Sequence, residues 1–189
     1  MLSPEAKARR DAERLCLSAY WKGDKSKPFV LELHDAFCVC DVVFPSGLAY
    51  VRLAIRAAAM KTIGLLPFSP LKVFFYRLLG MKIGRGVFIA PQVYVDPMFP
   101  RLIEIADDAV LGVGCRLFTH EYTATHFRIG RVRVGKGSVV GAFATVRPGV
   151  SLGSKVTVGF NSYVNRDVPD GDTVGGVPAK SLKTAQEGD

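Results

Sequence analysis

The stretch that decides the fold occupies residues 134–169 and reads VGKGSVVGAFATVRPGVSLGSKVTVGFNSYVNRDVP. Divided into sixes, each of its six blocks begins with Val or Leu, and four blocks place Gly second. A helix repeats its buried positions about every 3.6 residues and a strand every 2, so a period of six belongs to neither element alone.

The same period extends through much of the chain. Twelve aliphatic positions keep the phase, in three runs: Ile83, Ile89 and Val95; Ile105, Leu111 and Leu117; and Val134, Val140, Val146, Leu152, Val158 and Val164. A second small or apolar set follows four places after many of them: Val87, Val93, Ala109, Cys115, Ala144, Val150, Val156 and Val168. The loops of a β-sandwich vary in length and would not keep a strict six.

A coil with flat sides and tight corners explains this pattern. Each hexad is a short strand plus a turn; its leading aliphatic residue points inward, and the Gly that follows is expected to tolerate the backbone of the corner. Stacked coils pair as parallel strands and bury a continuous apolar column. The sequence therefore predicts a parallel β-helix over residues 81–180, with residues 181–189 as a C-terminal tail.

Two interruptions break the period. Val95 and Ile105 are ten residues apart, which leaves four extra residues within DPMFPRLIE. Leu117 and Val134 are seventeen apart, and FTHEYTATHFRIGRVR between them abandons the motif. Loops that leave a regular scaffold often carry function, so we expect the site there.

Residues 1–80 form a separate, mostly helical region in this prediction. Ser3 followed by Pro4 is a helix start, and the helix is expected to reach about Tyr20. The apolar, β-branched run at residues 29–44 leaves helix and strand open.

Two basic, amphipathic segments follow, at residues 48–66 and 69–80. The first has the length of a membrane span, but Arg52, Arg56 and Lys61 interrupt it. The first interpretation is that both segments pack against the rest of the protein. The alternative is peripheral contact with an anionic membrane through residues 48–79.

Composition narrows the class of protein. The chain has 189 residues, of which 49% are hydrophobic and 22% charged, as expected of a folded domain. A net charge of +8 favours an anionic partner, which could be nucleic acid, a phosphorylated cofactor or an acidic membrane. The first fourteen residues are charged throughout, so no signal peptide is predicted and the cytoplasm is expected.

The cysteines give no metal signal. Cys16, Cys38, Cys40 and Cys115 form no CxxC pair and no His/Cys cluster with zinc spacing. We expect small buried thiols in a reducing compartment, and no metal.

Several motifs resemble the hexapeptide-repeat acyltransferases, a family with a left-handed β-helix. They are IGRGVFIAPQVYVD, LGVGCRLFTHEY, VGAFATVRPGVSLGSKVTVGFNSYVNRDVP and GGVPAK, within residues 81–180. The closest likeness is to the sugar O-acetyltransferases related to the maltose and galactoside enzymes. The final VNRDVP and GGVPAK are similar to that family's usual T-K-D-(I/V)-P and G-(N/V)-P-A, which point to acyl transfer.

The resemblance implies an assembly and a reaction. The coils would have three faces, the protein would be a homotrimer, and the active sites would lie between neighbouring subunits. Acetyl-CoA would lie along the outside of the β-helix and donate its acetyl group to a hydroxyl of a sugar or saccharide-containing acceptor. No nucleic-acid partner is expected.

The resemblance also implies a histidine base on the longer interrupting loop. A hydroxyl is a poor nucleophile until a base of near-neutral pKa takes its proton. His120, three residues after Leu117, is the first choice and His126 is the second, whereas His34 lies outside the repeat. By the same resemblance, the backbone N–H of Ala142 would stabilise the oxyanion.

The resemblance also implies cofactor contacts, carried over by motif position. The acetyl-CoA set comprises Ala142, Phe160, Asn165, Arg166, Lys180 and Lys183; its basic members suit phosphate groups. Asp96 and Tyr122 are assigned to the acceptor.

The chain departs from the family pattern in three places. The asparagine that the maltose and galactoside enzymes use for sugar binding has no clear counterpart, and Asp96 is the nearest polar candidate. Phe160 stands in GFNS where the family has G-A-G-S, and its ring would crowd the pantetheine groove unless it turns away. The N-terminal 80 residues exceed the family's short helical cap, which leaves a polysaccharide or a lipid-linked sugar open as acceptor.

Two other functions are compatible with a β-helix of this kind. The carbonic anhydrases built on this β-helix need three zinc-binding histidines, two of them close together on neighbouring coils, whereas His120 and His126 share one loop. The other alternative is a non-enzymatic trimeric scaffold that presents its basic N-terminal helices to a membrane or a partner. Binding of CoA would distinguish the scaffold from the enzyme.

Overall fold

The computed structural model of the chain describes residues 4–32, 46–123 and 125–182. Several predictions lie outside these residues: the cap at Ser3, the role of Lys183, and the environments of His34, Cys38 and Cys40. Of the other two cysteines, Cys115 is buried as predicted. The same prediction is wrong for Cys16, which is exposed because helix α1 (Pro4–Lys22) buries only part of its surface.

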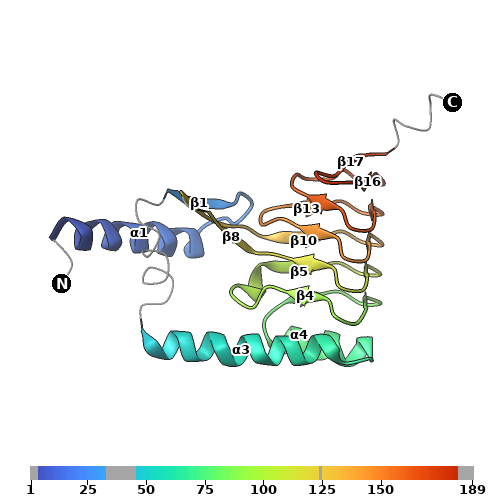
Figure 1. The fold of residues 1–189 in the computed structure, drawn as a ribbon, viewed down its shortest axis with the longest axis horizontal. Helices are drawn as coiled ribbons and strands as arrows, with labels where there is room; N and C mark the ends of the chain where they lie inside the picture. Colours follow the sequence, from blue (N-terminus) through green and yellow to red (C-terminus); the bar gives the residue numbers. More distant parts are fainter. Residues whose placement is uncertain (1–3, 33–45, 124, 183–189) are drawn as a thin grey trace.

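A parallel β-helix forms the body of the molecule (Figure 1). Its first face consists of β2 (Lys82–Ile83), β5 (Ile103–Ile105), β10 (Val132–Val134) and β13 (Ser151–Leu152). The second face consists of β3 (Phe88–Ile89), β6 (Val110–Leu111), β11 (Val139–Val140), β14 (Thr157–Val158) and β16 (Thr173–Gly175), with β17 (Lys180–Ser181) antiparallel at its end. The third face consists of β4 (Tyr94–Val95), β7 (Arg116–Leu117), β12 (Thr145–Val146) and β15 (Tyr163–Val164). The predicted β-helix is confirmed.

The six-residue period is the register of these sheets. The twelve in-phase residues form three columns: Ile83, Ile105, Val134 and Leu152; Ile89, Leu111, Val140 and Val158; Val95, Leu117, Val146 and Val164. Every member is at most 9% exposed, and the second predicted set is buried with them. Because a slip of one residue would turn each side chain outward, the burial fixes the register.

The glycine in the second place of the hexad was predicted to tolerate the backbone conformation of the corner, but the structure gives a different reason for it. A Cβ atom on Gly141 would lie 2.5 Å from the carbonyl oxygen of Val158 on the next coil, and one on Gly135 would collide with the carbonyl of Gly153. The left-handed backbone falls two places later in the hexad, for example at Gly137, where φ is 65°. At Gly135 and Gly141 the second place of the hexad therefore needs glycine because the next coil approaches closely there.

Both interruptions leave the β-helix at the corner between the third and first faces. Residues 96–102 include a short 3-10 helix, η1 (Pro100–Leu102). Residues 118–131 carry a hairpin, β8 (His120–Tyr122) and β9 (His126–Ile129), which β1 (Phe29–Glu32) extends to three antiparallel strands. The described part of the undecided run at residues 29–44 is thus a strand.

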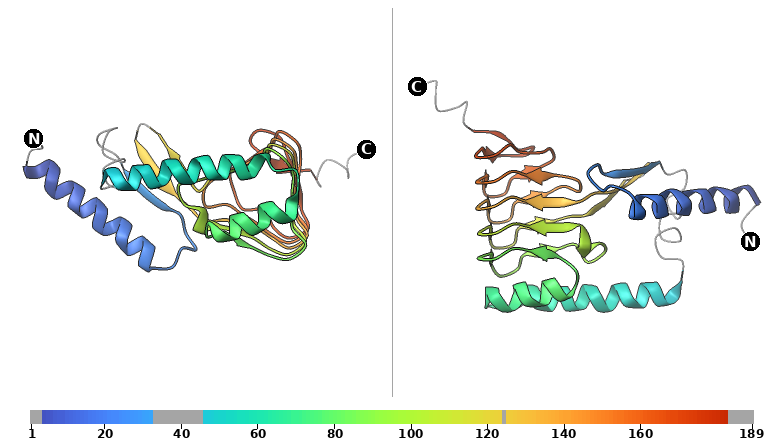
Figure 2. Two further views of the ribbon diagram at one scale, coloured as in Figure 1. Left: turned by 90° about the horizontal axis from the view of Figure 1, so that it is seen from below. Right: turned by 180° about the vertical axis from the view of Figure 1, so that it is seen from behind.

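Helix α1 covers this small sheet (Figure 2). Its Leu17 packs with Leu102, Phe127 and Ile129 in a second apolar cluster. The hairpin is therefore held from both sides rather than extended freely into solvent.

Helices α3 (Gly47–Leu65) and α4 (Ser69–Leu78) close the N-terminal end of the coils (Figure 1). Met60, Ile63, Val73 and Tyr76 join the main core. Ser69 Oγ accepts a 2.8 Å hydrogen bond from Ile89 N, which joins α4 to the first coil. No helix within the described ranges is long and apolar enough to cross a membrane.

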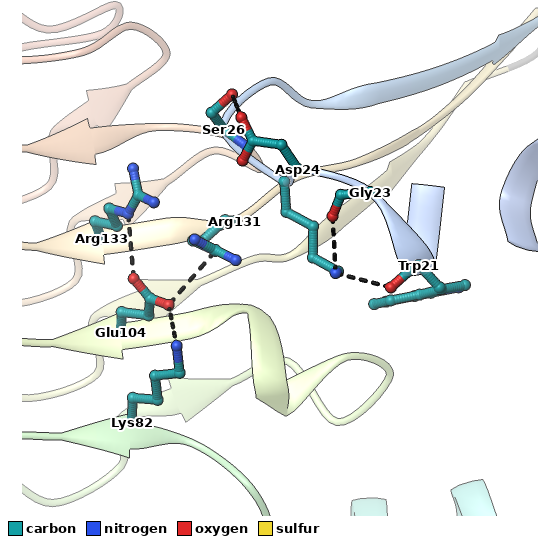
Figure 3. A network of polar contacts seen from close by, with 9 residues as sticks. Trp21, Gly23, Asp24, Ser26, Lys82, Glu104, Arg131 and Arg133 are labelled. Carbon is teal, nitrogen blue, oxygen red and sulfur yellow. Dashed lines mark hydrogen bonds and ion pairs between the residues drawn. The ribbon is translucent and has the colours of Figure 1, made fainter. Parts of the chain in front are cut away.

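An ion cluster ties successive coils together on the first face (Figure 3). Glu104 accepts hydrogen bonds from Lys82 Nζ at 2.9 Å and from Arg133 Nε at 3.2 Å, and Arg131 Nε lies 3.5 Å from its carboxylate. Burial alone would raise the pKa of Glu104, but these cations outweigh burial and lower it. The carboxylate therefore stays charged and links the first three coils.

Candidate active site

The candidate site lies where the two interruptions leave the coils. Asp96 follows β4 and His120 closely follows β7, the strand stacked on β4. Asp96 N donates a 3.1 Å hydrogen bond to Leu117 O. The two loops thus start one above the other, and residues 24 apart in sequence come into contact.

The contact is a short hydrogen bond between His120 Nδ1 and Asp96 Oδ2, at 2.5 Å. The same carboxylate oxygen accepts hydrogen bonds from Thr119 N, Thr119 Oγ1 and His120 N, at 2.9, 2.8 and 3.1 Å. Oδ1 accepts one from Met98 N at 2.9 Å. This network fixes the carboxylate, and the carboxylate fixes the imidazole.

The electrostatics determine which nitrogen of His120 carries the proton. Burial by itself would raise the pKa of Asp96, but the hydrogen bonds and charge of His120, with the Met98 and Thr119 bonds, lower it. An ionised carboxylate only accepts hydrogen bonds, so Nδ1 must donate. In the neutral ring, Nε2 then keeps its lone pair for an incoming proton.

The imidazole lies at the edge of an apolar cluster. Its centroid is 6.3 Å from that of Phe99 and 6.2 Å from that of Phe127. The side chain remains 25% exposed. The ring is therefore held in place and still reachable by a ligand.

His120 and Tyr122 both line a pocket of about 370 Å³. The other lining residues are Phe118, Glu121, Thr145, Arg147, Pro148 and Tyr163. The pocket is large enough for part of a small polar ligand, and it has a histidine, two tyrosines and an ion pair in its wall.

That ion pair was missed by sequence reasoning. Arg147 donates from Nε to Glu121 Oε2 at 2.7 Å and from Nη2 to Glu121 Oε1. These bonds raise the pKa of Arg147 and lower that of Glu121. They fasten β8, which carries His120, to the third coil.

A signal for this corner was nonetheless present in the sequence. In the six blocks of residues 134–169, Arg147 and Asn165 are the two residues that replace Gly in second place. Both follow a third-face strand, at the corner where the loops leave. A break in the glycine pattern thus coincides with the corner that holds the candidate site.

The second-choice histidine lies elsewhere. His126 is exposed, pairs with Glu32 of β1, and its Nδ1 lies 2.6 Å from Thr125 Oγ1. It does not line the pocket of His120. The structure therefore separates the two candidate bases by the length of the hairpin.

Ala142 and Phe160 occupy a different corner, between the second and third faces. Asn161 N donates to Ala142 O at 3.0 Å, so Phe160 lies one coil beyond Ala142. Phe160 is 77% exposed. His120 and Ala142 lie at opposite edges of the third face, so one chain alone does not bring them together.

The remaining predicted cofactor residues gather near the C-terminal end of the coils. Arg166 and Lys180 are exposed and line one hollow of about 410 Å³. Asp167 and Asp172 share this hollow, but they accept hydrogen bonds from Ser151 N and Ser181 Oγ. Asn165 lies beside Arg166, and its buried Oδ1 has no hydrogen-bond partner among the described residues.

The acceptor assignment of Asp96 needs correction. Its side chain has no exposed surface, and both carboxylate oxygens are occupied. A direct contact with an acceptor requires accessible atoms, so Asp96 is better described as a positioning residue for His120. Tyr122 is 47% exposed and remains a candidate.

The part of the chain that the structure describes holds no group of three or more His, Cys, Asp or Glu side chains arranged to bind a metal ion.

Known proteins resemble this chain in both sequence and fold. No family model matches the sequence. A Bacillus subtilis (strain 168) protein named "Putative acetyltransferase YvoF" is 37% identical over 122 residues, covering 64% of this chain and 71% of its own length.

Two solved structures share the fold. A maltose O-acetyltransferase from Clostridium difficile 630 superposes with a TM-score of 0.54 at 16% identity, over 74% of this chain and 89% of its own. The hexapeptide-repeat acetyltransferase VCA0836 of Vibrio cholerae O1 biovar eltor was solved in complex with acetyl coenzyme A. It superposes with a TM-score of 0.51 at 20% identity, over 73% of this chain and 89% of its own.

Together with the stacked parallel coils, these matches define an acetyltransferase class with a left-handed β-helix. The chain belongs to the hexapeptide-repeat acetyltransferase family. The family and the fold class predicted from the sequence are confirmed.

Proposed function

We propose that the protein transfers an acetyl group from acetyl-CoA to a hydroxyl of a sugar or saccharide-containing acceptor, with His120 as general base. The observation that carries this proposal is the 2.5 Å bond between His120 and buried Asp96, at the wall of an open pocket. The fold neighbours named above, one a maltose enzyme and one holding acetyl coenzyme A, support the choice of substrates.

The chemistry follows from the hydrogen bonds. His120 Nε2 takes the hydroxyl proton as the acceptor oxygen attacks the thioester carbonyl. Asp96 holds the Nδ1–H and stabilises the imidazolium. When the carbon–sulfur bond breaks, the imidazolium returns its proton to the leaving thiolate, so the products are the O-acetyl ester and free CoA.

Ala142 is proposed to supply the oxyanion donor. Its backbone N–H donates no hydrogen bond to any other described residue, and the residue is only partly buried. A fixed, unused N–H is what a developing oxyanion needs. It must come from a neighbouring subunit, because His120 of the same chain lies across the third face.

A trimer would unite the two corners. Three chains with parallel axes and their third faces turned inward would place the His120 corner of one against the Ala142 corner of the next. Phe160 would then line the acetyl-CoA groove from one side, with Asn165, Arg166 and Lys180 on the other. Lys183, beyond the described residues, would extend the cationic side toward phosphates.

Subunit complementation tests the shared site. His120→Ala removes the base, and Ala142→Pro removes the N–H; Pro91 and Pro148 already occupy the equivalent corner place, so this proline should fold. Each variant alone should be inactive in CoA release with a saccharide panel. Co-refolded in equal amounts, they should recover about a quarter of the wild-type rate, because that fraction of interfaces is intact.

Two outcomes would contradict the proposal. If both variants fold but their mixed trimers show no activity, the active site is not shared between subunits. Wild-type protein that neither binds CoA nor releases it would favour the scaffold alternative, in which the β-helix only presents its N-terminal helices.

A further inference from the structure

Helices α3 and α4 each bury one face and leave the opposite face open. Met60 and Ile63 of α3, and Val73 and Tyr76 of α4, point into the core. Viewed along the coil axis, α4 and the C-terminal part of α3 lie across the end of the β-helix, and the N-terminal part of α3 extends past the coils (Figure 2). Their other faces therefore point away from the coils, along the axis.

These open faces are apolar. Seven side chains, 41% to 68% exposed, form what we call the apolar end face: Val51, Ile55, Leu65, Phe68, Leu71, Phe74 and Leu78. In α4 the exposed members recur at i, i+3 and i+7, which makes one continuous stripe. A cluster of this size on a soluble domain marks an interaction surface.

The charges around the apolar end face have one sign. Residues 47–80 include five Lys or Arg and no Asp or Glu. Three of the five serve the fold: Arg56 donates to Met98 O, Arg77 donates to Ile83 O, and Lys72 is buried. Arg52 and Lys61 are exposed, and the 3.6-residue turn places them on opposite flanks of the α3 stripe.

Geometry and charge together select the occupant. In the trimer proposed above, neighbours packed along the sides of the coils leave this end uncovered, so a lipid surface or an end-to-end copy must cover it. Two copies end to end would bring Arg52 and Lys61 of each together, with no acidic residue in either segment to pair with them. Anionic headgroups attract the same cations.

We propose that the apolar end face docks on an anionic phospholipid bilayer as a peripheral contact. The apolar side chains enter the boundary between headgroups and acyl chains, and Arg52 and Lys61 contact lipid phosphates. The coil axis is then perpendicular to the plane of the bilayer. The His120 pocket lies near the bilayer surface, because β7 is only one coil beyond β4. This docking is independent of the acetyl transfer.

Vesicle sedimentation of the full chain tests the proposal. Wild-type protein should sediment with phosphatidylcholine vesicles that contain phosphatidylglycerol and far less with phosphatidylcholine alone. Ile55→Ser with Phe74→Ser should weaken partitioning at least about tenfold, and Lys61→Gln about fivefold, on anionic vesicles only. The matched control Val139→Ser, at a 37% exposed valine on β11 of the third coil, should bind like wild type.

Three results would overturn the docking proposal. The first is that wild-type protein sediments with neither vesicle type. The second is that a folded Ile55→Ser, Phe74→Ser double variant binds vesicles as wild type does. Analytical ultracentrifugation without lipid gives the third: if the double variant halves the particle mass, the apolar end face joins two copies of the protein.

Discussion

His120 Nδ1 lies 2.5 Å from Oδ2 of Asp96, a carboxylate without exposed surface that five hydrogen bonds hold in place. The arrangement fixes the tautomer of a histidine that lines an open pocket, and it does so from a residue that no substrate can touch.

Asp96→Asn tests this positioning role. The amide keeps the volume and can still accept from Thr119, but it can also donate to Nδ1 and so favour the tautomer with a protonated Nε2. We expect kcat to fall roughly 10²-fold or more, with KM for acetyl-CoA nearly unchanged. A purely structural role would instead lower the melting temperature and leave the pH–rate profile of the folded fraction as in wild type.

A pair of glycines tests the account of the coils. Gly135→Ala places a methyl group against the carbonyl of Gly153 and should cost about 3 kcal/mol of unfolding free energy. Gly137→Ala, two residues away, would place its methyl group no closer than 3.9 Å to Lys155 Cγ, so it should cost about 1 kcal/mol for the left-handed backbone alone, where φ is 65°. Urea unfolding of both variants gives the comparison, and the reverse order would show that conformation rather than close approach selects glycine.

The charge of Glu104 predicts a pH dependence of stability. Its pKa is lowered below the ordinary value of 4.5, so its contribution is complete above that pH and is lost as the pH falls through the folded-state pKa. Glu104→Gln should cost about 1 kcal/mol at pH 7 and progressively less below about pH 4.5. Lys136→Gln, in an exposed pair with Asp108, is the control and should change little at either pH. A cost independent of pH would show that Glu104 acts by packing.

The sequence was most informative where each residue repeats the same environment. Val140, Leu152 and Val158 were predicted to be buried from the period alone, and they are at most 2% exposed. Each hexad of a regular coil repeats the same buried position, so the three buried columns could be predicted without knowledge of any long-range contact.

Contacts between irregular segments were not predictable in this way. Strand β1 pairs with β9, which lies nearly a hundred residues further along the chain. No local pattern in residues 29–32 predicts this pairing. Asp96 was assigned to the acceptor as the nearest polar candidate for a missing sugar-binding asparagine. Its burial against His120 could not be predicted, because that burial depends on two loops starting one above the other. The glycine pattern itself was visible, but its cause, the approach of the next coil, required three dimensions.

The choice between the two loop histidines tests the central claim most directly. CoA release is to be measured with acetyl-CoA and a saccharide panel for wild type, His120→Ala and His126→Ala, with folding checked by circular dichroism and CoA binding by calorimetry. His120→Ala should bind CoA nearly as wild type does and lose roughly 10²–10⁴-fold in rate, whereas His126→Ala should lose far less. An inactive His126→Ala beside an active His120→Ala, or two variants as active as wild type, would contradict the assignment of His120 as the base.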